Sequence, residues 1–443
     1  MGPEASVATQ AAARGEAVRV EGMADGKIKC SETSQTLREL RDENARLRKE
    51  LKVMKSKDIG PQKGFTRLIT ALAAITMYNV IYSVDGFLKR VGVFCALVLL
   101  AKLAGLPFAP LHVPSNRRIQ MFFVLLTFAP LNMIECTSLY FAYAWYFRNN
   151  MSMIVPWIAY AIYIFFDRNP SRGGYRWCKN WFRSLYLHRF VAEYYPCKLI
   201  KTADLPKDQN FVFGYHPHGV ISIGAQANFG TDATGFKQLF PGIEMTLMTL
   251  RLTFRVPIFR EWVMAHGLAS CGERSCNKIL SETNMGRAIM IVIGGAAESL
   301  DARPDYMDLT ILKRKGFVRI ALKNGAWLVP VISFGENDVF GAIPNRRGSV
   351  IRKVQNWLQK KLGVAPVVFV GRGIFQYAFG VLPHRRPITS VVGAPIKCPH
   401  VPGVVRGDEV IDFWHKKYVD ALKKLHDEHK DKYAPTSADL RLY

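Results

Sequence analysis

The feature that most constrains the fold of this chain is a pair of long apolar stretches between residues 119 and 166. One runs over 119–147 and the other over 151–166. A helix needs about 20 apolar residues to cross a bilayer, so these stretches and the short turn between them predict a helical hairpin in a membrane. Two weaker apolar stretches precede them, at 68–84 and 91–106, and their number of crossings stays open.

Basic residues flank the apolar region on both sides. The chain carries 60 Lys and Arg residues against 35 Asp and Glu residues, a net charge of +25, and basic clusters occupy 52–63 and 168–189. Because positively charged flanks stay on the cytosolic side of a membrane, we expect an even number of crossings and both termini in the cytosol. So basic a chain implies an anionic partner, but it has no basic–aromatic module typical of nucleic-acid binding.

The N-terminal region differs from the rest of the chain. Residues 1–34 are rich in small and polar residues, which predicts disorder. A heptad over 37–54 predicts either a short coiled coil that joins copies of the chain into a homo-oligomer or an amphipathic helix on a basic surface. The eight cysteines include no C-x2-C pair, so we expect reduced thiols and no metal site.

Beyond residue 205, short apolar runs alternate with helical stretches. The expected strands lie at 211–215, 288–293, 328–333, 367–370 and 390–392, and helices are expected at 317–323 and 349–362. This alternation predicts an α/β fold in which helices cover a sheet, preceded by the hydrophobic helical hairpin. An apolar stripe over 411–425 predicts a terminal helix docked on the core or on the membrane surface.

The chain accordingly divides into four parts. Residues 1–60 form the disordered or coiled-coil region, and 65–167 hold the membrane-embedded helices, with the hairpin at 119–166. Residues 168–433 form the cytosol-facing α/β domain, and 434–443 are a tail.

The sharpest local motif is a strand-like run that ends in His216-Pro217-His218-Gly219. Strand ends that lead into glycine-rich turns are where α/β proteins place reactive groups. Histidine suits general-base chemistry near neutral pH, and Gly219 allows a substrate or backbone to approach closely. Two alternatives stay open, a metal-binding pair and imidazoles that only satisfy buried backbone groups.

A second run ends in Gly294-Gly295-Ala296-Ala297-Glu298. Glu298 is positioned either to orient an imidazole or to cap the following helix. No nucleophile elbow, Walker lysine motif or dinucleotide fingerprint is present, which argues against a covalent serine hydrolase, a P-loop ATPase and a dinucleotide enzyme.

A third block places four cations within seven residues at the start of a predicted helix. It predicts either an anion site for a phosphate-bearing substrate or a solvated basic face. The block reads Lys313, Arg314, Lys315, Gly316, Phe317, Val318 and Arg319.

These motifs together resemble the type-2 diacylglycerol acyltransferase family, which includes monoacylglycerol and wax-alcohol acyltransferases. The resemblance covers about residues 115–433 and departs from the common Tyr-Phe-Pro at 194–196, where this chain has Tyr-Tyr-Pro. The matching blocks are 215–219, 228–229, 240–242, 294–300, 314–322, 329–337, 371–373 and 387–395. A weaker likeness joins the group to the glycerol-phosphate acyltransferases, but their His–Asp dyad is absent because Ile221 and Ile223 stand at the Asp positions.

The resemblance implies a membrane-anchored acyltransferase-like sheet that moves a fatty acyl group from acyl-CoA to diacylglycerol without a further cofactor. His216 or His218 would be the general base, assisted by Glu298. Backbone N–H groups at Gly219 or Gly294-Gly295 would stabilise the oxyanion. The basic block would face the CoA phosphates, and Asn337 would contact substrate.

Several points stay open beside this interpretation. Monoacylglycerol or a long-chain alcohol is the alternative acceptor, and a lipid-binding scaffold of the same fold is the non-enzymatic alternative. The implied location is the endoplasmic reticulum membrane, in a multi-pass arrangement that also permits lipid droplets.

Overall fold

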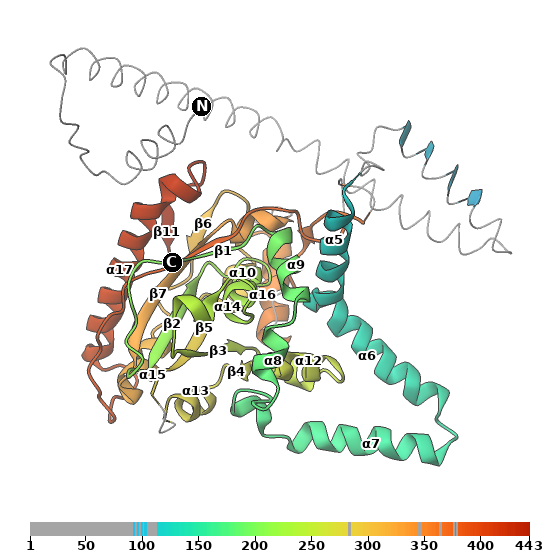
Figure 1. Cartoon of the computed structure of the whole chain (residues 1–443), viewed down its shortest axis with the longest axis horizontal. Helices are drawn as coiled ribbons and strands as arrows, with labels where there is room; N and C mark the ends of the chain where they lie inside the picture. The colour runs from blue at the N-terminus through green and yellow to red at the C-terminus, as the bar shows by residue number, and fades with distance from the viewer. Residues whose placement is uncertain are drawn as a thin grey trace, which may run out of the picture. The chain divides into compact units, whose positions relative to one another are not determined.

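The computed structural model describes most of the chain beyond residue 112 (Figure 1). The predicted regions at 1–60 and 68–84 lie outside the described residues, and so does half of the stretch at 91–106. The described residues are 92–93, 95–96, 99–100, 102–103, 113–281, 285–342, 345, 348–362, 366–374, 377 and 380–443.

A seven-stranded sheet organises the region after residue 197, in the order β1-β10-β7-β2-β5-β3-β4. Neighbouring strands are parallel except β10 and β7, which are antiparallel. The strands are β1 (Lys198–Lys201), β2 (Phe211–His216), β3 (Glu244–Thr249), β4 (Ala269–Ser270), β5 (Arg287–Val292), β7 (Trp327–Phe334) and β10 (Thr389–Val392). The prediction of a mixed α/β fold is therefore confirmed.

The central strand β2 is buried along its whole length. Strands of parallel sheets that are covered on both faces read as continuous apolar runs, which is why Phe211–Tyr215 was recognisable as a strand. Phe211, Phe213 and Tyr215 belong to the core on one face of the sheet, and Val212 belongs to the core on the other.

Helices cover both faces of this sheet (Figure 1). On the face of Val212 lie α13 (Glu273–Leu280), α15 (Gly316–Asn324) and α17 (Glu409–Tyr433). On the opposite face lie α10 (Ile223–Phe229), α11 (Phe236–Leu239) and α12 (Phe259–Ala265).

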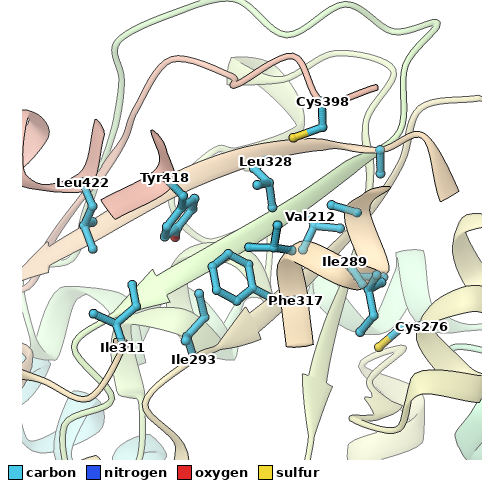
Figure 2. Packing of buried hydrophobic residues seen from close by; sticks show 14 of the residues in the cluster. Val212, Cys276, Ile289, Ile293, Ile311, Phe317, Leu328, Cys398, Tyr418 and Leu422 are labelled. Atoms are coloured by element: carbon cyan, nitrogen blue, oxygen red, sulfur yellow. The ribbon is translucent and has the colours of Figure 1, made fainter. Parts of the chain in front are cut away.

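The terminal helix α17 docks on the core. Its residues Tyr418 and Leu422 are fully buried and belong to the same core as Val212, and Figure 2 shows Tyr418 beside Leu328 and Phe317. The apolar stripe at helical spacing predicted this docking, and the alternative of a helix lying on the membrane surface is not needed for these side chains.

Smaller elements complete the region. The expected strand at 367–370 is only β9 (Phe369–Val370), and it pairs with β8 (Gly341–Ala342) outside the main sheet. The tail contributes β11 (Leu440–Leu442), which lies parallel to β6 (Met307–Leu309). The remaining elements are α8 (Lys179–Arg183), α9 (Leu187–Tyr194), α14 (Gly295–Ser299), α16 (Val350–Leu362), η1 (Asn169–Ser171), η2 (Arg251–Arg255) and η3 (Glu336–Val339).

The apolar region at 115–166 forms three helices, α5 (Ser115–Thr127), α6 (Ala129–Tyr146) and α7 (Met151–Phe166). The apolar stretch at 119–147, which Pro130 interrupts in the sequence, is broken at Phe128 because proline removes a backbone donor and favours the start of a new helix. Within the described residues no single helix passes the length and apolarity expected of a membrane span, whereas α5 and α6, bent by 56°, pass it together.

Helices α6 and α7 contact each other across the turn at 147–150. The Tyr140 and Trp157 rings stack with centroids 4.7 Å apart, and the Trp157 indole Nε1–H donates to the Tyr140 carbonyl at 3.0 Å. No residue of α7 is buried, although its side chains are almost all apolar.

A buried charge cluster ties the end of α7 to the α/β region. Arg260 of α12 is fully buried and pairs with Asp167, which follows α7, and with Glu261. Glu261 also accepts hydrogen bonds from the hydroxyls of Tyr160 and Tyr175. Removing one partner from such a buried ion pair is strongly destabilising, so this cluster fixes where α7 joins the domain.

Candidate active site

The loop Pro217–Ser222 leaves the carboxyl end of β2 at the centre of the sheet. It begins with a cis His216–Pro217 peptide bond, and Gly219 has a φ of +59°. A Cβ at Gly219 would lie 2.8 Å from Cγ of Glu336. Only glycine therefore lets this loop lie so close to Glu336.

His216 is fully buried at the end of β2. Its Nε2 lies 3.2 Å from the Tyr418 hydroxyl, which itself donates to the Gly214 carbonyl at 3.1 Å. Since the tyrosine hydrogen is donated to Gly214, the Tyr418 oxygen can only accept from His216. Nε2 of His216 therefore carries a hydrogen, and its hydrogen bond to Tyr418 joins β2 to α17. Burial lowers the pKa of His216 to about 3, so this imidazole is neutral at physiological pH.

His218 is half-buried, and it makes its hydrogen bond through Nδ1 where His216 uses Nε2. Its Nδ1 lies 3.1 Å from the Gly219 carbonyl oxygen, which can only accept a hydrogen bond. Nδ1 therefore carries the hydrogen, and Nε2 keeps its lone pair. Burial lowers the pKa of His218, and among the described residues its Nε2 has no hydrogen-bond partner. This is the protonation state that a general base requires.

Glu298, in the short helix α14 that follows β5, holds the backbone of this loop. Its Oε1 accepts from the His218 backbone N–H at 2.6 Å, and its Oε2 accepts from the Thr310 backbone N–H at 2.7 Å. The carboxylate thus contacts the main chain of His218, and no hydrogen bond to the imidazole is seen among the described residues. Burial raises the pKa of Glu298 to about 7, although both backbone donors act to lower it.

Glu336, which the sequence did not single out, holds the other end of the same loop. Its carboxylate accepts from the Tyr215 hydroxyl at 2.7 Å and from the backbone N–H groups of Ile223 and Gly224 at 2.7 and 2.8 Å. Burial raises its pKa to about 7 as well. The sequence could have indicated this residue by its position just after β7, since the ends of the parallel strands β2 and β7 lie at the same edge of the sheet.

The glycines of the β5–α14 turn have different roles. A Cβ at Gly294 would lie 2.1 Å from Oε2 of Glu298, so glycine makes room for the carboxylate. Gly295 has a φ of +58° and faces open space. In the part of the chain described here, the backbone N–H groups of Gly219 and Gly294 make no hydrogen bond.

Asn337 lies beside this loop but faces a neighbouring segment. It is buried, and its Nδ2 donates to the Tyr306 carbonyl at 2.7 Å.

Two of the four cations in the basic block after β6 form ion pairs within the part of the chain that the structure describes, and two do not. Lys315 pairs with Asp412 at 2.6 Å and Arg319 with Glu273 at 2.7 Å, which leaves Lys313 and Arg314 exposed without a carboxylate partner among the described residues. The charge of Arg314 acts to lower the pKa of Glu298, so it lies on the side of the candidate site.

Two other residues of the block are placed differently. Gly316 opens α15 and is exposed, whereas Phe317 is buried with its ring 4.7 Å from that of Tyr418. Phe317 therefore supports the core beneath His216.

Two cavities, of about 520 and 340 Å³, lie away from the histidine loop. The larger lies between Arg183 and the segment 232–238, and the smaller lies beside Lys201 and Pro241. Neither is lined by a residue of the candidate site.

Comparison with known proteins gives a consistent result. The family model for diacylglycerol acyltransferase matches residues 144–443. Diacylglycerol O-acyltransferase 2A of Umbelopsis ramanniana is 42% identical over 334 residues, covering 74% of this chain and 90% of that protein. Diacylglycerol O-acyltransferase 2 of Dictyostelium discoideum is 40% identical, covering 74% and 96%.

A human relative carries a different acceptor in its name. The 2-acylglycerol O-acyltransferase 1 of Homo sapiens is 43% identical, covering 74% of this chain and 96% of that protein. Among solved structures, a 1-acyl-sn-glycerophosphate acyltransferase of Thermotoga maritima aligns over 68% of this chain and 99% of its own, with 13% identity and a TM-score of 0.31. A score this low carries no argument about the site.

The two buried carboxyl groups predict an inverted pH dependence of stability. Because their pKa values rise from 4.5 to about 7 on folding, the folded state binds more protons between these values. The free energy of unfolding should therefore fall as pH rises from about 4.5 to about 7. Glu298→Gln and Glu336→Gln should each flatten this slope in denaturant titrations across that range.

Asp420→Asn, on the exposed face of α17, is the matched control and should leave the slope unchanged. A slope in both glutamine variants equal to that of the unmodified chain would contradict the assignment.

Proposed function

This chain belongs to the diacylglycerol acyltransferase family, and from this membership we propose that it esterifies diacylglycerol with the acyl group of acyl-CoA, forming triacylglycerol. It is an acyltransferase. The single observation on which the proposed mechanism rests is that Nε2 of His218, at the carboxyl end of the central strand, has no hydrogen-bond partner among the described residues. The 2-acylglycerol acceptor is the second candidate, because a relative of similar identity carries it in its name.

The proposed reaction is a direct transfer without an acyl-enzyme. The acceptor hydroxyl oxygen attacks the thioester carbonyl carbon while Nε2 of His218 takes the hydroxyl proton. The tetrahedral intermediate then collapses, the C–S bond breaks, and the imidazolium returns the proton to the leaving CoA thiolate. The products are the new ester and free CoA, and no redox or metal step is required.

Three groups support this reaction in our proposal. The backbone N–H groups of Gly219 and Gly294 have no hydrogen bond among the described residues, which suits an oxyanion hole. The N–H of His218 is already used by Glu298, so it does not serve this role. Lys313 and Arg314, exposed and unpaired among the described residues, would bind the CoA phosphates.

Membrane attachment through α6 and α7 is part of the proposal. Large apolar side chains on these helices are strongly exposed, for example Trp145 at 72% and Phe165 at 78%. A contiguous exposed surface of this kind indicates contact with lipid or another protein. We propose that α6 and α7 insert as a hairpin in the endoplasmic reticulum membrane with both termini cytosolic, an arrangement that also permits lipid droplets.

The catalytic proposal predicts the behaviour of purified full-length protein with radiolabelled acyl-CoA. Diacylglycerol should be esterified faster than monoacylglycerol or a long-chain alcohol. His218→Ala should lower the single-turnover rate about 10²–10⁴-fold, the usual effect of losing a general base. Since burial lowers the pKa of His218 from 6.5, the rate should hold its plateau down to pH 6.5 and fall only at lower pH, where the imidazole gains a proton.

His400→Ala, at an exposed histidine, is the matched control and should keep the rate of the unmodified chain. His216→Ala should reduce thermal stability, because it removes the contact with Tyr418. A near-normal rate in His218→Ala together with loss in His216→Ala would assign the base to His216 instead. A faster reaction with another acceptor would reassign the substrate.

The membrane proposal predicts the sidedness of two introduced cysteines. In sealed microsomes, with the other exposed cysteines replaced by serine, Lys423→Cys on α17 should react with a membrane-impermeant maleimide. Arg148→Cys, in the turn between α6 and α7, should react only after the membrane is permeabilised, because a spanning hairpin places it on the luminal side. Labelling of both positions in sealed vesicles would refute a spanning hairpin.

A further inference from the structure

Three arginines from separate segments lie close together, and we call them the arginine patch. Arg372 of the 371–373 motif and Arg385 lie beside Tyr194, and Arg117 of α5 is near enough for its charge to act on Arg385. The Arg385 guanidinium lies 4.3 Å from the centroid of the Tyr194 ring, and its Nη1 donates to Oε1 of Gln120 at 2.6 Å. The Arg372 guanidinium lies 4.4 Å from the Tyr377 ring, and its Nη2 lies 3.7 Å from Sδ of Met121 on α5.

The patch holds three positive charges without a carboxylate to balance them. Among the described residues no Asp or Glu lies within ion-pair distance of Arg117, Arg372 or Arg385. Glu193 instead accepts from Nε2 of Gln120 at 3.0 Å. Burial lowers the pKa of Arg385, and the charges of Arg117 and Arg372 lower it further, although Tyr194 acts in the opposite direction.

The patch lies where an apolar helix begins. Arg117 is in the first turn of α5, and the same helix exposes the apolar side chains Ile119, Phe122 and Leu126. Basic residues at the end of an apolar helix lie at the headgroup level of a membrane. With about 3.6 residues per turn, Ile119, Phe122 and Leu126 lie on the face of α5 opposite Arg117. The apolar surface on the side of the patch comes instead from the segment of Arg372, which bridges Leu382 and exposes Ile374, Tyr377 and Val381.

The patch is also linked to the histidine loop. Tyr194 packs in one buried cluster with Tyr195, Val220 and Ile223, and the last two belong to the chain just after His218. A ligand held by the arginines that contact Tyr194 would therefore be linked, through this buried cluster, to the segment that shapes the candidate active site.

We propose that the arginine patch binds the phosphate of an anionic phospholipid headgroup, with the acyl chains of the lipid along the exposed apolar side chains Ile374, Tyr377 and Val381. The inference rests on the membrane attachment proposed above. Guanidinium groups suit this role because each is planar and can donate two parallel hydrogen bonds to two oxygens of one phosphate. The CoA phosphates are the other source of the same chemistry, but the apolar surface beside the patch fits a lipid.

The test measures binding of dioctanoyl phosphatidic acid to the full chain in detergent, with dioctanoyl phosphatidylcholine as the headgroup comparison. The unmodified chain should bind the phosphatidic acid saturably and more tightly. Arg372→Gln/Arg385→Gln should weaken it at least about tenfold, since one charge-assisted hydrogen bond contributes about that factor. Arg117→Gln, at an exposed side chain, should weaken it in the same direction without disturbing the core.

Lys416→Gln/Lys423→Gln removes the same charge from exposed positions of α17 and should leave lipid binding unchanged. Unaltered binding in Arg117→Gln and in the double arginine variant would overturn the proposal. Displacement of the lipid by free CoA would also overturn it and assign the patch to CoA. Acyl transfer is measured on the same samples, so a chain that binds the lipid but transfers no acyl group would contradict the proposed function and not this site.

Discussion

Two buried carboxylates hold the loop on which the candidate active site depends. Glu298 lies in α14 after β5 and Glu336 in η3 after β7, yet both accept hydrogen bonds from backbone N–H groups of the chain just after β2. A buried N–H without a partner costs about 1–3 kcal/mol, so these carboxylates decide which shape of the loop is stable. The pKa values of both glutamates are raised, because burial disfavours the charged carboxylate more than the hydrogen bonds from the loop favour it. The loop is therefore held by two carboxyl groups whose ionisation is costly.

The loop gives its two histidines opposite roles through simple hydrogen-bond constraints. Tyr418 fixes the proton of His216 on Nε2 and anchors β2 to α17, whereas the Gly219 carbonyl fixes the proton of His218 on Nδ1. One imidazole is thus buried and structural, and the other is half-exposed with a free lone pair. The same two residues looked equivalent as a pattern, because tautomer and exposure are properties of the folded surroundings.

Local patterns predicted the parts of the fold that local physics decides. Strands β2, β5 and β7 follow from continuous apolar runs, and α17 follows from its apolar stripe. Contacts between residues far apart in the chain could not be predicted from local patterns. Glu336 accepts a hydrogen bond from Ile223, more than 110 residues away, and Asp412 and Glu273 pair with two of the four cations of the basic block. The break at Phe128 follows from Pro130, which interrupts the apolar stretch in the sequence, but the bend between α5 and α6 depends on how the two helices pack.

The central claim is that Nε2 of His218 receives the acceptor proton. The most direct measurement is an experimental structure of the full chain with diacylglycerol and a non-reactive thioether analogue of acyl-CoA. The account predicts the acceptor hydroxyl oxygen within about 3 Å of Nε2 of His218, with the acyl carbon next to it. An acceptor oxygen beside Nδ1 of His216, or out of reach of both rings, would contradict it.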